Sequence, residues 1–222
     1  SAESYKNKIV TFLKAYGKRL MPLSELETKC RTKRSGRENF VEAFDQLRRE
    51  GVITVRKGMK VALCSRLDFK TGTISRLSRT FGFAVTDEGV EYFIPGKCMM
   101  GAMPGDRVLI ADIPSRTGEP EGEVQDIIQI GSSALTGRIE FVDGKPYLVP
   151  DIASKNHMII AGTDGVELRN GDKVLAEIVF RGRRHAEHKV KITSVFGSSE
   201  LAASCAQAIL ATHGAPGEYP EE

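Results

Sequence analysis

The segment 71–130 constrains the fold more than any other part of the chain, because short apolar stretches alternate there with glycine-containing turns. The candidate strands span 72–77, 81–86, 91–94 and 107–113. Turns are expected at 87–89, 103–106 and 118–122. Evenly spaced short strands with glycine turns are typical of small closed β-barrels, and we expect one from this segment.

The strand expected at 81–86 has an unusual alternation. Phe81 and Phe83 share one face of an extended strand, whereas Gly82 and Ala84 share the other. Phe93 can join the two phenylalanines from the next strand. Aromatic rings on one sheet face beside arginines form a stacking platform for unpaired bases. The arginines here are Arg76 and Arg79. The alternation fits the opposite interpretation equally well, with the phenylalanines in the core and the alanine at the surface.

Charge is distributed unevenly along the chain. Residues 1–70 carry 17 Lys and Arg against 8 Asp and Glu, whereas the whole chain has a net charge of +3. A local surplus of this size suggests a polyanionic partner, although a solvated basic face fits it too. No apolar run approaches the length of a membrane span, so we expect no membrane partner. The four cysteines are scattered without metal-type spacing, which indicates reduced thiols in a cytoplasmic protein.

Residues 1–67 are expected to form a winged helix, which consists of three helices and a β-hairpin. The first helix has an apolar stripe made by Tyr5, Ile9, Phe12 and Leu13. Ser35, with Glu38 three residues on, is expected to cap the third helix in a capping box, and Gly51 to follow its end. Alternating residues on both sides of Lys57-Gly58 predict the hairpin.

Basic side chains cluster at the entry to the third helix, where helix-turn-helix proteins meet a phosphate backbone. They are Lys29, Arg31, Lys33, Arg34 and Arg37. We expect this cluster to contact nucleic acid, with structured RNA as a candidate ligand. The alternative is a winged helix that contacts only protein.

Residues 131–196 resemble a second, weaker copy of residues 68–130. Gly137-Arg138-Ile139 parallels Gly72-Thr73-Ile74, and the sequence YLVP parallels YFIP. Asp143-Gly144 is a strong hairpin signal. The second copy lacks the Phe-Gly-Phe face. Two tandem five-stranded barrels of the oligonucleotide-binding (OB) type follow from this repeat.

A basic run stands near the end of the second copy. It comprises Arg181, Arg183 and Arg184. The run is a candidate phosphate contact, with a solvated strand end as the equal alternative. His185 and His188 lack partners at metal-type spacing and are expected at the surface. Residues 197–222 carry a serine cap and an alanine-rich run, which predict a C-terminal helix. The chain is thus expected to be a mixed α and β, multidomain protein: a winged helix, two OB-type barrels and a C-terminal helix.

The stretch GTISRLSRTFGFAV, followed by EYFIP, resembles the paired ribonucleoprotein motifs of a cold-shock domain. The resemblance implies that Phe81 and Phe83 stack bases in the first motif and that Phe93 does so in the second. Thr80 stands where a glycine is usual, and Pro95 where a histidine is common. Both variants are associated with the cold-shock domains of large ribonucleases, and they put only the histidine's contact in doubt.

The order of a winged helix, two cold-shock domains and a helical tail resembles the N-terminal half of ribonuclease R-type members of the ribonuclease II family. This resemblance implies a parent enzyme that degrades RNA processively from the 3′ end. Magnesium would be held by clustered aspartates in a catalytic domain beyond the helical lead-in at 197–222. For this chain it implies no catalytic residue, no cofactor and no metal. The implied role is to bind single-stranded RNA and guide it to the parent's own catalytic domain.

Two alternatives from other classes stay open. The chain could be a stand-alone regulator whose winged helix binds duplex DNA, or an RNA chaperone. It could also be a protein-docking module without nucleic-acid binding.

Overall fold

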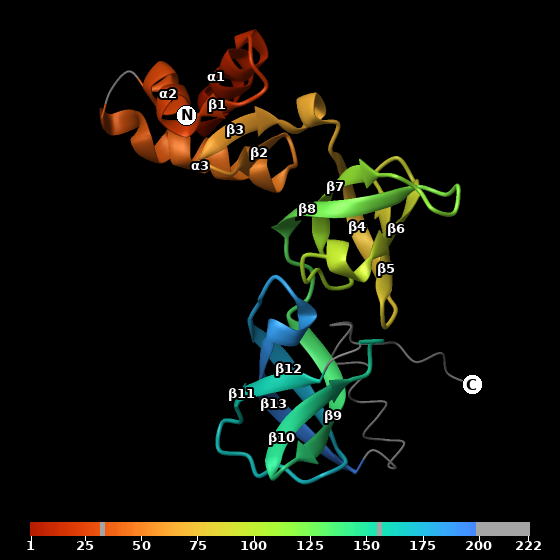
Figure 1. The fold of residues 1–222 in the computed structure, drawn as a ribbon. Coiled ribbons are helices and arrows are strands. Elements are labelled where there is room, and N and C mark those ends of the chain that lie inside the picture. Colours follow the sequence, from red (N-terminus) through yellow and green to blue (C-terminus); the bar gives the residue numbers. More distant parts are fainter. Residues whose placement is uncertain (32–33, 155–156, 199–222) are drawn as a thin grey trace, which may run out of the picture.

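The computed structural model describes residues 1–31, 34–154 and 157–198, so Lys33 and residues 199–222 of the predicted C-terminal helix lie outside the described residues. The first two positions of this predicted helix, 197 and 198, belong to a strand instead. Within these ranges the chain forms a helical part with a small sheet, followed by two closed five-stranded barrels (Figure 1). The predicted mixed architecture with two barrels is confirmed. None of the helices in the described part of the chain is long and apolar enough to cross a membrane.

The first part contains the elements that the winged-helix prediction requires. Its helices are α1 (Ala2–Ala15), α2 (Leu23–Cys30) and α3 (Arg37–Arg49). Its strands are β1 (Met21–Pro22), β2 (Ile53–Arg56) and β3 (Lys60–Leu63), arranged in the order β1-β3-β2. The hydrophobic core between helices and sheet includes Ile9, Leu13, Leu26, Phe40 and Ile53. The two-residue strand β1 is not predicted from the sequence, because it is too short to show an alternation.

The predicted capping box of the third helix is wrong. Helix α3 begins at Arg37 after a 3-10 turn, and Gly36 stands at its N-cap without a side-chain capping hydrogen bond. A Cβ atom on Gly36 would lie only 2.0 Å from the hydroxyl oxygen of Tyr5. Packing against α1 therefore selects the residue at the cap. The predicted role of Gly51 after the helix is supported, because its φ of +75° is one that glycine adopts readily.

The first barrel is built from five strands in the closed order β4-β5-β6-β8-β7. They are β4 (Lys70–Leu77), β5 (Phe81–Thr86), β6 (Glu91–Pro95), β7 (Arg107–Ile113) and β8 (Glu121–Gln129). Four of them lie where the sequence places them, to within two residues. The fifth, β8, closes the barrel by pairing with β7 and, in parallel, with β6.

The second barrel has the same strand connectivity, β9-β10-β11-β13-β12. Its strands are β9 (Ala134–Val142), β10 (Lys145–Pro150), β11 (Met158–Gly162), β12 (Asp172–Phe180) and β13 (Lys189–Ser198). The hairpin turn is confirmed, because Asp143 and Gly144 both have positive φ angles, 52° and 76°. The matching of YLVP to YFIP is wrong. YLVP lies in β10, the second strand of its barrel, whereas YFIP lies in β6, the third strand of the other.

Polar contacts join the helical part to the first barrel. Arg56 donates to the side chain of Gln125 over 2.7 Å, and Gln129 donates to the backbone carbonyl of Arg49 over 3.4 Å. A small apolar cluster of Cys64, Leu109 and Ile128 lies at the same junction. The first barrel is therefore attached to α3 and β2 by its strand β8.

Candidate nucleic-acid interface

Three phenylalanine rings form a compact group on the outer face of the first barrel. Phe83 pairs directly with Phe93 across β5 and β6. The ring centroids of Phe81 and Phe93 are 5.1 Å apart, those of Phe83 and Phe93 5.8 Å, and those of Phe81 and Phe83 5.6 Å. All three side chains keep partial exposure, while Gly82 and Ala84 between them are buried. We call Phe81, Phe83 and Phe93 the aromatic face. The alternative, in which these rings form the core, is excluded.

The inverted pattern of large residues outside and small residues inside has a steric cause. A Cβ atom on Gly82 would lie 2.9 Å from the sulfur of Met99 and 3.1 Å from a methyl carbon of Leu77. Ile74 and Ile94 are also fully buried there. The interior behind β5 is already filled by residues from other segments, so its small residues face inward and its rings face outward.

Arginine side chains flank the aromatic face. The guanidinium carbon of Arg76 lies 4.1 Å from the ring centroid of Phe83, and its side chain is 63% exposed. It also approaches the carboxylate of Glu91 at 3.9 Å. Arg79 lies in the turn before β5 and is exposed. The three rings and Arg76 are thus brought together, with a cation beside a ring as in surfaces that stack unpaired bases, whereas Arg79 is placed only by its position two residues before Phe81.

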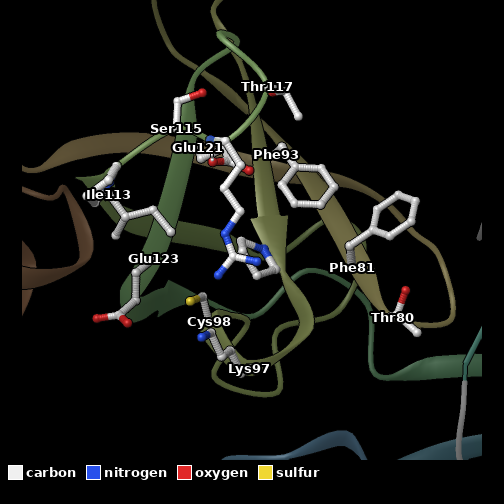
Figure 2. A pocket seen from close by; sticks show the side chains of 13 residues that line it. Thr80, Phe81, Phe93, Lys97, Cys98, Ile113, Ser115, Thr117, Glu121 and Glu123 are labelled. Atoms are coloured by element: carbon white, nitrogen blue, oxygen red, sulfur yellow. Dashed lines mark hydrogen bonds between the residues drawn. The ribbon is translucent and has the colours of Figure 1, made fainter.

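A pocket of about 630 Å³ adjoins the aromatic face. Figure 2 shows Phe93 and Ile113 on opposite sides of it, with Glu121 near one end and Lys97 and Cys98 near the other. Sequence reasoning missed this pocket. Its residues come from β5, β6, β7 and β8 and from the segments that join these strands, and the closure of the barrel by β8 brings Glu121 beside Phe93.

The cysteines of the described part of the chain are buried and free. Burial raises the pKa of the Cys30 thiol to about 11 and that of Cys64 to about 12. Burial and the neighbouring carboxylate of Glu123 also raise the pKa of Cys98. A thiol protonated at neutral pH is a poor nucleophile and a poor metal ligand. Among the described residues, no three His, Cys, Asp or Glu side chains are grouped so as to hold a metal ion.

Only part of the predicted basic cluster in the helical part is free of ion pairs with described residues. Lys29 pairs with Glu25 at 3.5 Å and Arg31 with Glu27 at 3.3 Å, each one helical turn away. Arg34 and Arg37 are exposed and make no ion pair with any described residue. Exposed ion pairs contribute little and are easily exchanged. The free cations of this cluster in residues 1–31 and 34–154 are therefore Arg34 and Arg37 at the start of α3.

The predicted basic run at 181–184 has a different environment from the expected one. Arg181 pairs with the fully buried carboxylate of Asp106 in the first barrel at 2.6 Å, and only 15% of its side chain is exposed. Arg184 pairs with Glu187 at 3.1 Å, while Arg183 is exposed. Arg181 is thus committed to a contact between the barrels, because the carboxylate that it neutralises has no access to water.

The expectation that both histidines lie at the surface is wrong. His188 is fully buried, and its two ring nitrogens contact the carbonyl of Gly101 at 2.8 Å and the N–H of Gly182 at 3.1 Å. The ring of His185 reaches the carbonyl of Ala102 at 2.8 Å. Burial lowers the pKa of His188, and Arg181 lowers it further. The contacts with Gly101 and Ala102 join the two barrels across more than 80 residues of sequence, so a single sequence gives no signal for them.

The barrel topology and the aromatic face define a tandem OB-barrel protein with partly exposed aromatic rings on the outside of its first barrel. A family model for the ribonuclease B OB domain matches residues 72–127, and one for the cold shock domain matches residues 147–220. Together with the curated relatives described next, these matches show that the chain is similar to the N-terminal region of the ribonuclease R/ribonuclease II family.

The curated relatives are exoribonucleases. Ribonuclease R of Vibrio cholerae is 28% identical over 86% of this chain and 24% of its own length. Ribonuclease R of Thermotoga maritima is 28% identical over 91% of this chain and 29% of its own length. Exoribonuclease 2 of Vibrio vulnificus is 29% identical over 54% of this chain and 19% of its own length. The chain thus spans about a quarter of the length of the ribonuclease R proteins that it matches.

Solved structures show the same fold. Mycoplasma genitalium RNase R, solved in complex with ribose methylated single-stranded RNA, aligns with a TM-score of 0.54 at 16% identity. The match covers 67% of this chain and 25% of that one. The yeast pseudonuclease Ssd1 aligns with a TM-score of 0.51 at 12% identity, over 64% of this chain and 24% of its own.

Proposed function

We propose that this chain binds single-stranded RNA, with bases stacked on the aromatic face and phosphates contacted by Arg76 and Arg79. The observation that carries the proposal is the group of three outward rings whose centroids lie within 6 Å of one another, with the guanidinium of Arg76 over one of them. Base–aromatic stacking tolerates any base sequence, because every base has a π face.

Within a protein of the length of its relatives, the chain would act as an N-terminal RNA-binding region. It would guide the strand towards a separate catalytic domain that degrades RNA from the 3′ end in the cytoplasm. Two-metal hydrolysis of a phosphodiester needs several carboxylates that converge on magnesium. We assign that chemistry to the catalytic domain and only binding to the residues of this chain.

The helical part would add a second contact to structured RNA. Arg34 and Arg37 stand at the start of α3, the position from which helix-turn-helix proteins contact phosphates. Lys29 and Arg31 would join them by exchanging their glutamate partners for phosphates. Phosphate contacts position a nucleic acid without selecting its sequence.

A competition experiment tests the proposed ligand. The chain is bound to a fluorescent single-stranded RNA decamer, and unlabelled single-stranded RNA, duplex RNA and duplex DNA are added at a fixed salt concentration. We expect single-stranded RNA to compete best and duplex RNA to compete through the helical part. Stronger competition by duplex DNA would favour a DNA-binding regulator, and no binding of any ligand would favour a protein-docking module.

A further inference from the structure

The pocket beside the aromatic face has the form of a site for the edge of a nucleobase. Phe81 and Phe93 form one apolar wall, and Ile113 lies on the opposite side (Figure 2). Its volume of about 630 Å³ falls in the range of small-molecule sites. A base stacked on Phe93 would therefore extend its polar edge into this pocket.

Among the polar groups that line the pocket, which include Lys97 and Arg116, the buried acceptor is the carboxylate of Glu121. Glu121 is the direct partner of Phe93 in the β6–β8 pairing, and only 4% of the residue is exposed. Its Oε2 atom accepts the backbone N–H of Arg116 at 2.5 Å. Its Oε1 atom accepts no hydrogen bond from any described residue. Since Oε1 is not among the fully buried side-chain atoms without a partner, it is open to a hydrogen-bond donor from water or from a ligand.

The loop that carries Arg116 is held in place without any ligand. The hydroxyl of Ser115 donates to the carbonyl of Glu119 at 2.6 Å and accepts the N–H of Gly118 at 2.9 Å. The N–H of Arg116 fixes the orientation of Glu121. The acceptor is therefore oriented before a base arrives, which reduces the ordering cost of binding.

The second carboxylate of the pocket is already in use. Glu123 accepts a hydrogen bond from the side chain of Gln125 at 2.9 Å and lies next to the thiol of Cys98. Glu121 is thus the acceptor available to a ligand, and Glu123 serves as a matched control.

We propose that this pocket selects guanine, whose N1–H and N2–H donors meet the carboxylate of Glu121 while the ring stacks on Phe93. An ionised carboxylate only accepts hydrogen bonds, and it accepts two adjacent donors well. Guanine presents two such donors side by side on its Watson–Crick edge. Uracil presents one donor between two carbonyl oxygens, which the carboxylate repels. Adenine and cytosine, with one amino group each, fall between them. This inference rests on the proposed RNA-binding function and adds a base preference to it.

The test uses a uridine decamer and three versions with one central guanosine, inosine or adenosine. Inosine lacks only the N2 amino group, so it removes one donor without any change to the protein. Dissociation constants are measured by fluorescence anisotropy for the wild-type chain, Glu121→Gln and Glu123→Gln. Glutamine keeps an oxygen for the N–H of Arg116 but turns donors towards the base.

We expect the guanosine decamer to bind the wild-type chain about fivefold or more tightly than the uridine decamer, with inosine between them. Glu121→Gln should abolish this difference, because it removes both the acceptor for guanine and the repulsion of the uracil carbonyl oxygens. Glu123→Gln should keep the preference.

Equal affinities of guanosine, inosine and uridine decamers for the wild-type chain would overturn the base preference and leave the proposed function intact. If Glu121→Gln weakened all decamers equally, Glu121 would serve only to hold its loop. Absence of binding to every decamer would refute the proposed function itself. If Glu121→Gln failed to fold by circular dichroism, the inosine comparison would still decide the question.

Discussion

Removal of the aromatic face is the most informative perturbation of the proposed function. Each base stacked on an aromatic ring contributes about 1–3 kcal/mol, as measured by alanine substitution. Phe81→Ala combined with Phe83→Ala removes two of three rings and should cost about 2–6 kcal/mol of binding free energy. Because about 1.4 kcal/mol corresponds to a factor of ten, single-stranded RNA should bind at least about thirtyfold more weakly.

The same substitution should leave the barrel folded. The rings are partly exposed on the outer face, so their loss opens no enclosed cavity. The lost burial should cost about 1–2 kcal/mol per ring, within the 5–15 kcal/mol stability of an ordinary domain. Core phenylalanines would instead cost about 3–5 kcal/mol each, and the double variant would unfold. Stability and binding therefore separate the two interpretations.

The assay pairs fluorescence anisotropy on a uridine decamer with thermal denaturation followed by circular dichroism. Phe141→Ala is the matched control, because Phe141 is 38% exposed on β9 of the second barrel and lies outside the aromatic face. We expect the control to bind like the wild type. An unfolded double variant, or a folded one with undiminished affinity, would refute the reasoning about the aromatic face.

Three further predictions concern charge, pH and catalysis. Arg34→Gln with Arg37→Gln should make the slope of log affinity against log salt concentration less steep, by up to about the contribution of two phosphate contacts. An unchanged slope would mean that these side chains face solvent or protein. The pKa of His188 is lowered by burial, so the unfolded state takes up the proton first as the pH falls below 6.5. The free energy of unfolding should therefore decrease as the pH falls from 6.5 towards the lowered pKa. Urea denaturation at pH 7 and pH 5 should show a larger loss of this free energy for the wild type than for His188→Gln. Equal losses would contradict this account. The purified chain should bind 3′-labelled RNA yet release no nucleotides in millimolar magnesium or manganese; chelator-sensitive release that survives repurification would reveal an active site in these residues.

Local patterns in the sequence predict the strands well but leave their faces open. The bounds of β5 follow from its alternation and flanking turns. Which face of β5 points inward depends on Met99 and Leu77, which fill the interior from other segments. Periodicity alone could not choose between the two faces, and the resemblance to cold-shock motifs was needed to favour the correct one.

Features that depend on distant partners could not be predicted. Ser35 has the right spacing for a capping box, yet the close approach of Tyr5 to Gly36 places the start of α3 elsewhere. Arg181 looks like any basic strand end until the fold brings Asp106 next to it. Glu121 looks like one of several glutamates until β8 pairs with β6 and places it beside Phe93. Each of these positions is determined by a tertiary contact with no local signature.

The buried ion pair between Asp106 and Arg181 has a consequence for how the two barrels move. Asp106 also accepts the backbone N–H groups of Met103 and Gly131, so the carboxylate ties together a turn of the first barrel, the connecting segment and the second barrel. Separation of the barrels would break this ion pair together with the contacts of His185 and His188 with carbonyl groups of the first barrel. The barrels should therefore share one rotational correlation time in solution rather than tumble independently. An RNA strand held by the first barrel would then face the second at a fixed distance and at a high effective concentration, without the entropic cost of a flexible tether.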